Sequence, residues 1–159
     1  MRIALDENHV TWLVTDEGLA QLTFEMWSLK RKAAHYESLT RPRHDRHGLV
    51  ADCALREFGN LESFFLKDND NDGLWTSIYL GALCFQYAVT KDPEVKQKAW
   101  RHYDAMEMLE RITGIPGFIA RSYVIKGEEH SKGGEWHPTP DGEWTWKGDT
   151  SSDEMVGHL

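Results

Sequence analysis

Two long runs of helical periodicity, joined by a few residues that interrupt a helix, constrain the fold of this chain more than any other feature. The first run extends from Leu74 to Val89 and repeats apolar residues at the spacing of one helix face. The second follows Pro93 and ends before Gly114, a residue suited to helix termination. Between the runs, Asp92 can act as N-cap for a helix with proline at its first position. Such a short connection predicts an antiparallel pair of helices.

The same periodicity predicts which faces of these helices are buried. For the first helix, the predicted buried stripe consists of Ile78, Ala82, Phe85 and Val89. For the second helix, the predicted inward residues are Val95, Ala99, Tyr103, Met106, Leu109 and Ile112. Both helices are rich in aromatic side chains, so we expect each to pack against partners on more than one side.

Three short extended segments precede the helices and are separated by turn-forming residues, which predicts small strands. They cover residues 2–5, 10–14 and 19–24. After them, Ser28 can cap a helix that runs through about Ser38. Pro42 is expected to end this helix, because proline lacks the backbone donor that a helix interior needs. Residues 43–67 are predicted to be irregular.

The C-terminal part of the chain loses the helical pattern. Residues 119–124 form an extended run, and Trp136-His137 is predicted to pair with Trp144-Thr145-Trp146 as a β-hairpin. Ser151 and Glu154 have the spacing of a capping box, which predicts a short final helix.

The composition limits the classes of partner. The 159 residues are 40% hydrophobic and include seven tryptophans, which is typical of a globular protein. A net charge of −8 disfavours nucleic acid as a partner, because nucleic-acid binding depends on a basic surface. Cys53 and Cys84 lack neighbours at metal-ligand spacing, so neither a zinc site nor a disulfide framework is predicted. No apolar run is long enough for a membrane span, and no signal peptide is recognisable, so we expect no membrane partner.

The segment from Asp68 to Gly73 concentrates oxygen-bearing side chains just before the first long helix. Calcium sites take oxygen ligands from alternate residues of a tight loop, and Asp68, Asp70 and Asp72 have that spacing. A complete EF-hand loop would need a carboxylate where this chain has Tyr79. The segment is therefore either a cation site or a polar helix entrance, and Ca²⁺ is the one candidate cofactor.

Aromatic and polar residues gather near the helix entrances and the hairpin. Such clusters are typical of sugar sites, where flat rings stack on pyranose faces and carboxylates bind hydroxyl groups. The candidate substrate-binding residues are Trp75, Trp136, Trp144, Trp146 and Glu154. Ordinary packing in a core or a hairpin would equally explain the tryptophans of the hairpin.

Two reaction types fit the polar residues. Glycoside hydrolysis uses two carboxyl groups, for which Asp72 and Asp149 are the main candidates. Both lie close to helix starts, where capping alone can explain an aspartate. Elimination from a uronic acid instead needs a cation for the sugar carboxylate, a base and an acid. The candidate catalytic residues of those types are Arg121, His137 and Tyr123.

Three motifs, over residues 70–76, 113–122 and 146–154, resemble the α/α-toroid (six-hairpin glycosidase-like) module of large secreted bacterial proteins. In those proteins the module follows a β-propeller region, and the segment Trp12–Leu19 resembles a single propeller repeat. The superfamily includes sugar hydrolases, unsaturated uronyl hydrolases and polysaccharide lyases. The resemblance implies that Asp72, Arg121 and Asp149 face a central cavity. A complete toroid has more hairpins than this chain supplies, so the chain resembles a fragment.

Together these features predict a mainly α fold. It would be an incomplete α/α-toroid over residues 27–159, with a C-terminal β-hairpin, preceded by a β segment over residues 1–26. The predicted function is part of a carbohydrate-active enzyme, either a glycoside hydrolase or a polysaccharide lyase. The alternatives are a non-catalytic glycan-binding or sensory module with a structural Ca²⁺ loop, and an inactive fragment. The resemblance implies a secreted or periplasmic parent protein, a carbohydrate ligand, and self-association that covers exposed toroid faces.

Overall fold

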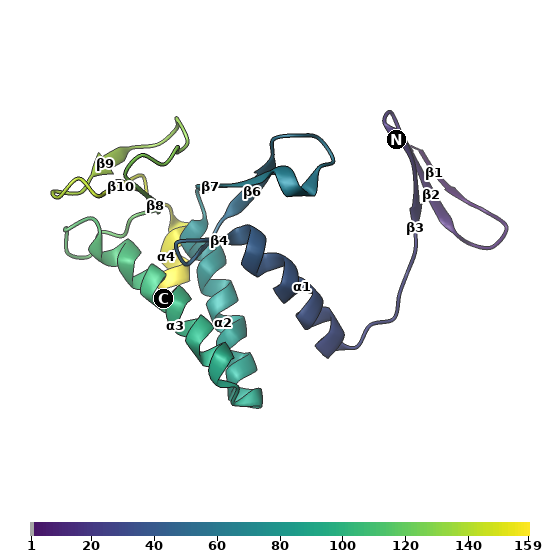
Figure 1. Ribbon diagram of the computed structural model, residues 1–159, viewed down its shortest axis with the longest axis horizontal. Helices are drawn as coiled ribbons and strands as arrows, with labels where there is room; N and C mark the ends of the chain where they lie inside the picture. Colours follow the sequence, from purple (N-terminus) through teal and green to yellow (C-terminus); the bar gives the residue numbers. More distant parts are fainter. Residues whose placement is uncertain (1) are drawn as a thin grey trace. The chain divides into compact units, whose positions relative to one another are not determined.

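The computed structural model describes residues 2–159 and divides the chain into two compact units, one ending at Tyr36 and the other formed by Glu37–Leu159. Helices make up 41% of the structure and strands 23%, and the strands form small antiparallel sheets (Figure 1). The fold is therefore mixed α and β, and the prediction of a mainly α, incomplete toroid is wrong. The strands that the sequence did not reveal are two to four residues long, too short to show an alternating pattern.

The first unit contains the three predicted strands, and they form an antiparallel sheet. Its strands are, in order across the sheet, β1 (Arg2–Leu5), β2 (Thr11–Thr15) and β3 (Gly18–Leu22). Asp6 shapes the first turn, because its carboxylate accepts hydrogen bonds from the indole of Trp12 and from the backbone N–H groups of Asn8 and Val10. These bonds, the one from Trp12 first, lower the pKa of Asp6. The turn therefore favours an ionised aspartate at this position.

Helix α1 (Leu29–His44) is longer than predicted. The hydroxyl of Ser28 accepts a hydrogen bond from the N–H of Arg31 at 3.2 Å, which confirms the predicted cap. Pro42 does not end the helix but lies inside it. Only two helical residues follow Pro42, so the missing backbone donor disturbs no more than the final turn.

Helices α2 (Asp72–Thr90) and α3 (Pro93–Arg111) form the predicted antiparallel hairpin (Figure 1). Lys91 ends α2 with a positive φ of 55°, and its N–H donates to the carbonyl of Tyr87. The carboxylate of Asp92 then accepts a hydrogen bond from the N–H of Glu94 at 2.9 Å, as expected of an N-cap.

The face of α2 predicted to be buried is exposed. Ile78, Phe85 and Val89 are 57%, 79% and 85% exposed. The buried residues of α2 are Asp72, Gly73, Thr76 and Leu83. The prediction failed because α2 has no charged residue after Asp72, so no polar stripe marks its solvent side. Even so, none of the helices within residues 2–159 has both the length and the apolar character required to cross a bilayer.

The core of the second unit lies between α3 and the C-terminal sheet. Of the residues predicted to face inward on α3, Val95, Met106, Leu109 and Ile112 are buried, whereas Tyr103 is half-exposed. The main cluster of buried hydrophobic residues consists of Leu49, Ala105, Met106, Leu109, Ile112, Ile119, Ala120, Tyr123 and Trp146. One face of α3 thus supplies a third of this core, and the residue after the helix, Ile112, adds to it.

The C-terminal sheet contains the predicted hairpin and one further strand. Its strands are β8 (Ser122–Ile125), β9 (Trp136–Pro138) and β10 (Trp144–Lys147), with β10 in the middle. Both pairings are antiparallel, and Trp146 lies opposite His137 on β9 and Tyr123 on β8. The predicted pairing of residues 136–137 with residues 144–146 is confirmed.

The region predicted to be irregular contains two small β-hairpins. Strand β4 (Asp45–Arg46) pairs with β5 (Leu49–Val50), and β6 (Asp52–Leu55) pairs with β7 (Phe64–Lys67) around a 3₁₀ turn, η1 (Leu61–Ser63).

Gly48 allows the β4–β5 turn to approach α3 closely. A Cβ at this position would lie 2.9 Å from the carbonyl oxygen of Arg101 and 2.9 Å from the Cβ of Ala105. The φ of Gly48 is also +90°, a conformation that residues with a side chain rarely adopt. Glycine is therefore required where this turn meets α3.

The final helix, α4 (Ser152–His158), packs against α2. The helix was predicted, but its capping box was not formed as expected. Among the described residues the Ser151 hydroxyl has no hydrogen-bond partner, and Glu154 Oε1 accepts a bond from the N–H of Leu74 on α2 at 3.4 Å. A contact between helices has replaced the local cap, so α4 depends on α2 rather than on its own sequence.

Candidate functional site

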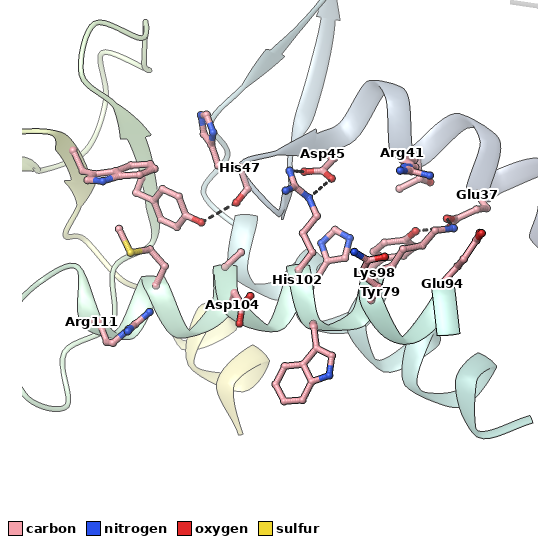
Figure 2. A pocket seen from close by; sticks show the side chains of 18 residues that line it. Glu37, Arg41, Asp45, His47, Tyr79, Glu94, Lys98, His102, Asp104 and Arg111 are labelled. Carbon is pink, nitrogen blue, oxygen red and sulfur yellow. Dashed lines mark hydrogen bonds and ion pairs between the residues drawn. The ribbon is translucent and has the colours of Figure 1, made fainter. Parts of the chain in front are cut away.

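The second unit has a groove of about 1100 Å³ that follows α3 (Figure 2). Its residues from α3 are Glu94, Gln97, Lys98, Trp100, Arg101, His102, Asp104, Ala105, Met108 and Arg111. The remaining lining residues come from α1, the β4–β5 turn, α2, β8 and β10, and are Glu37, Thr40, Arg41, Asp45, His47, Tyr79, Tyr123 and Trp144. The groove therefore draws on segments from most of the second unit.

Glu37 is the centre of a polar cluster at one end of the groove. Its carboxylate accepts hydrogen bonds from the hydroxyl of Tyr79 and from the ammonium group of Lys98. Burial raises the pKa of Glu37, but the bonds from Lys98 and Tyr79 outweigh this effect and bring the pKa below its ordinary value. Burial, together with the bond to Glu37, raises the pKa of Tyr79. At neutral pH this cluster presents an ionised carboxylate and a neutral phenol.

Asp45 and Arg101 form a two-pronged ion pair in the middle of the groove (Figure 2). Arg101 Nε lies 2.7 Å from Asp45 Oδ2, and Arg101 Nη2 lies 2.8 Å from Asp45 Oδ1. The N–H of Gly48 also donates to Asp45 at 2.9 Å. Burial raises the pKa of Asp45, but these bonds, the one from Arg101 first, bring it below its ordinary value. The pair holds both side chains in fixed orientations on the wall of the groove.

His102 is buried beneath this ion pair. Its Nδ1 lies 2.6 Å from the carbonyl oxygen of Gly48, so Nδ1 carries the proton and donates a hydrogen bond to this oxygen. Its ring meets the ring of Tyr79 edge to face, with centroids 4.9 Å apart. Burial lowers the pKa of His102 and outweighs the bond to Gly48. The imidazole is therefore neutral at pH 7, with Nε2 as its unprotonated nitrogen.

The lining of the groove includes the aromatic rings of Tyr79, Tyr123 and Trp144. The rings of Trp144 and Tyr123 meet edge to face, with centroids 5.4 Å apart. Tyr123 donates its hydroxyl hydrogen bond to the carbonyl of His47 at 3.2 Å. Trp100 projects from α3 and is 54% exposed, so much of its ring is open to a ligand. The groove lining therefore combines aromatic rings with charged groups.

The charges of the groove balance. Its lining includes four basic side chains of lysine or arginine, Arg41, Lys98, Arg101 and Arg111. It includes as many acidic side chains, Glu37, Asp45, Glu94 and Asp104. The chain as a whole carries a net charge of −8, so the groove is much less acidic than the rest of the protein.

The residues predicted to face a common cavity lie outside this groove. Asp72 is fully buried. Arg121 joins two segments, because its Nε donates to the carbonyl of Asp70 at 2.6 Å and its Nη1 donates to the carbonyl of Asp149 at 2.9 Å. The Asp149 carboxylate lies 3.6 Å from the same guanidinium. The structure thus brings Arg121 and Asp149 together as a clamp between two loops.

Among the other predicted site residues, Tyr123 and Trp144 line the groove. Trp146 belongs to the buried core, and His137 lies against it with ring centroids 4.5 Å apart. Glu154 is fully buried.

The two remaining predicted tryptophans lie elsewhere on the surface. Trp136 lies against His130, with ring centroids 4.2 Å apart, and Trp75 is 46% exposed on α2. The predicted sugar-contacting residues are therefore divided among the groove, the core and other surfaces.

The three aspartates of the predicted Ca²⁺ loop have separate partners. Asp68 accepts hydrogen bonds from the backbone N–H and the hydroxyl of Ser131 at 2.7 and 2.6 Å. The carboxylate of Asp70 binds the ammonium group of Lys147, and Asp72 is bound in the interior. Across residues 2–159, no group of three or more His, Cys, Asp or Glu side chains is placed to share a metal ion. In this structure, Asp68 and Asp70 tie the loop to the C-terminal region.

Sequence reasoning missed most of the groove. Charged residues such as Lys98 and Arg101 on an amphipathic helix usually mark its solvated side, and nothing local shows that α1 and β8 enclose them. One signal was present. His102 lies seven residues after Val95 and seven before Leu109, so a polar residue interrupts the buried stripe of α3.

Comparisons with known proteins identify no relative of this chain, so the groove is the basis for a functional proposal. No protein-family model matches the chain, and neither a curated protein nor a solved structure shows significant similarity to it.

Proposed function

We propose that the groove along α3 binds an oligosaccharide and that the chain is the sugar-contacting part of a carbohydrate-active protein. The observation that carries this proposal is the combination of aromatic rings and fixed ion pairs in one groove. Aromatic faces stack on the apolar faces of pyranose rings, while a rigid pair such as Asp45–Arg101 offers an acceptor and a donor to neighbouring hydroxyl groups.

The size and charge of the groove narrow the class of sugar. Pockets for a single small ligand occupy roughly 300–1,000 Å³, so a groove of about 1100 Å³ has room for more than one sugar ring. Its balanced charges favour a neutral oligosaccharide over a polyanionic one, because bound carboxylates would meet Glu94 and Asp104 as well as the arginines. We therefore propose a neutral oligosaccharide as the ligand.

Catalysis is a second candidate, favoured by two side chains of the groove. Glu37 is an ionised carboxylate, and His102 is a neutral imidazole, so each could accept a proton. Hydrolysis also needs a protonated carboxyl group. The carboxyl groups whose pKa is raised, those of Asp72 and Glu154, are fully buried and do not line the groove. This arrangement supports binding more directly than turnover.

The setting of the parent protein is also part of the proposal. The motifs that resemble six-hairpin glycosidase-like proteins support a carbohydrate-active parent, and a neutral ligand favours a hydrolase over a lyase. Polysaccharides are encountered outside the cytoplasm, so we propose that the parent is secreted or periplasmic.

Isothermal titration calorimetry with neutral hexasaccharides of glucose, xylose and mannose tests the binding proposal. Trp100→Ala removes the most exposed ring of the groove, and we expect it to weaken the affinity for the best hexasaccharide at least tenfold, about 1.4 kcal/mol. A hexagalacturonate of the same length should bind more weakly than the neutral sugar.

Trp75→Ala is the matched control, because Trp75 is another half-exposed tryptophan on a helix but lies outside the groove. It should leave the affinity unchanged. The proposal fails if none of these sugars binds, or if the Trp100 and Trp75 variants lose affinity equally.

A further inference from the structure

A buried histidine on the wall of the groove has one nitrogen without a protein partner. His102 lies on α3, is 5% exposed, and belongs to the residues that line the groove (Figure 2). Its Nδ1 bonds to the carbonyl of Gly48, whereas its Nε2 has no hydrogen-bond partner in the part of the chain that the structure describes. Nε2 is also not one of the six unpartnered side-chain atoms of residues 2–159 that are sealed from solvent. Because the imidazole borders the groove, Nε2 is open to a ligand there.

A chain of hydrogen bonds through the β4–β5 turn fixes the orientation of this imidazole. Arg101 binds Asp45 through two bonds of 2.7 and 2.8 Å, and Asp45 Oδ1 accepts a hydrogen bond from the N–H of Gly48 at 2.9 Å. The carbonyl oxygen of Gly48 lies 2.6 Å from His102 Nδ1. The two polar backbone groups of one glycine therefore connect the ion pair to the imidazole.

The surroundings of the imidazole leave the turn and the ring little room to move. The turn passes so close to α3 that a Cβ on Gly48 would lie 2.9 Å from the carbonyl oxygen of Arg101 and from the Cβ of Ala105. The ring of Tyr79, on α2, packs against the imidazole with the two planes 84° apart. Contacts from α2, α3 and the β4–β5 turn thus make Nε2 a rigid group.

The bond to Gly48 also decides which kind of ligand group Nε2 can bind. A carbonyl oxygen only accepts hydrogen bonds, so the proton of the neutral imidazole is on Nδ1 and Nε2 can only accept. The donors Lys98 and Tyr79, which also line the groove, both bind Glu37 instead. A ligand that displaces water from Nε2 must therefore bring a donor of its own, because a buried acceptor without a donor is costly.

We propose that His102 is a specificity-determining residue of the groove and that its Nε2 accepts a hydrogen bond from one hydroxyl group of the bound sugar. This inference rests on the proposed binding of a neutral oligosaccharide. A hydroxyl group donates to Nε2, whereas a deoxy position, an O-methyl ether or a carboxylate offers no hydrogen. Sites built around such a bond reject ligands that lack the donor, since the acceptor of the site then stays unpaired. The groove thus selects for a free hydroxyl group at one position of the sugar.

His102→Asn separates the roles of the two nitrogens. The amide nitrogen of asparagine takes the place of Nδ1 and can keep the bond to Gly48, but asparagine has no atom in the place of Nε2. Calorimetry compares the best-binding neutral hexasaccharide with its monodeoxy analogues. We expect at least one analogue to bind the unmodified chain tenfold or more weakly than the parent sugar does. The same analogue should bind His102→Asn as well as the parent sugar does, and the parent sugar itself should lose at least tenfold in affinity.

His102→Gln is the matched control. The terminal amide of glutamine reaches the place of Nε2, and its oxygen can accept a hydrogen bond there, so this variant should regain preference for the parent sugar over the analogue. Nitrogen-15 NMR of the free, unmodified chain at pH 7 should show His102 protonated at Nδ1 and unprotonated at Nε2. Circular dichroism checks that both variants are folded.

The outcomes separate this inference from the binding proposal. If the free chain has the proton on Nε2, or if His102→Asn still discriminates against the analogue, the role of His102 is overturned while sugar binding stands. If all monodeoxy analogues bind the unmodified chain as tightly as the parent sugar, the role of His102 is likewise overturned. If no hexasaccharide binds, both proposals fail.

Discussion

Arg46 is the cation on which the buried polar network of the second unit depends. It is 5% exposed, and it donates to Asp72, to the hydroxyl of Ser122 and to the carbonyl of Tyr123. A buried ion pair of this kind adds little net stability compared with apolar residues, because both charges had to leave water. Removing only one member of the ion pair is different, because the remaining charge stays buried without a partner.

Arg46→Leu should therefore destabilise the chain by about 3–5 kcal/mol, because it leaves Asp72 buried and unpaired. Urea unfolding followed by circular dichroism measures this loss. Arg101→Leu is the matched control, because it breaks an ion pair whose arginine is 55% exposed, and it should cost no more than about 1 kcal/mol. Equal losses in the two variants would show that Arg46 does not have this role.

At the scale of the elements, sequence periodicity was sufficient where the local signal was long or redundant. The α2–α3 hairpin has fifteen or more residues of pattern in each helix and a capped break at Asp92, and it was predicted correctly. The hairpins of β4 to β7 were missed because two to four residues cannot establish a period. The prediction of a Ser151–Glu154 capping box was wrong, because the Glu154 carboxyl group accepts a hydrogen bond from the distant N–H of Leu74 instead.

The groove was harder to predict than the elements that form it. Tyr123 was found as a candidate catalytic residue and Trp144 as a candidate sugar contact, whereas Glu37 and Lys98 were not found. The distance in sequence between Glu37 and its partners on α2 and α3 explains this, because no local pattern connects them.

The solvent-exposed side of α2 is an apolar surface suited to association with another protein surface. Trp75, Ile78, Ala82, Phe85 and Val89 follow one another at intervals of three and four residues, and no charge interrupts them. This spacing is typical of a surface that packs against another helix. We propose that copies of the chain associate through this surface.

Phe85→Glu places a charge in the middle of this apolar stripe and should shift the chain toward the monomer. Light scattering coupled to gel filtration, over a range of protein concentrations, measures the change. Gln86→Glu is the control, because it adds the same charge one residue away on a side chain that is not part of the stripe. An unmodified chain that stays monomeric at all concentrations would contradict the prediction.

At the scale of the whole molecule, the chain consists of two units with separate contents. Within residues 2–159, no residue that lines the groove precedes Glu37, and the core cluster likewise lies within the second unit. The β1–β3 sheet has its own turn, organised by Asp6. The groove proposed to bind sugar is therefore contained in the second unit.

Removing residues 2–26 should accordingly leave the second unit folded and its oligosaccharide affinity unchanged. Two-dimensional NMR spectra and calorimetry of the shortened and full chains provide the comparison. A loss of dispersed signals from α2 and α3 in the shortened chain would show instead that the two units depend on each other for folding.

The junction of Arg46, Asp72 and Ser122 has a consequence for the order in which the chain folds. It joins positions 26, 50 and 76 residues apart, whereas α2 and α3 meet through adjacent segments. Closing longer loops costs more entropy, so we expect the α2–α3 hairpin to form early and this junction late. During folding, the carboxylate of Asp72 at the start of α2 would thus stay unpaired until β4 and β8 dock against the helix. These polar contacts would be the last to form and would complete the interior.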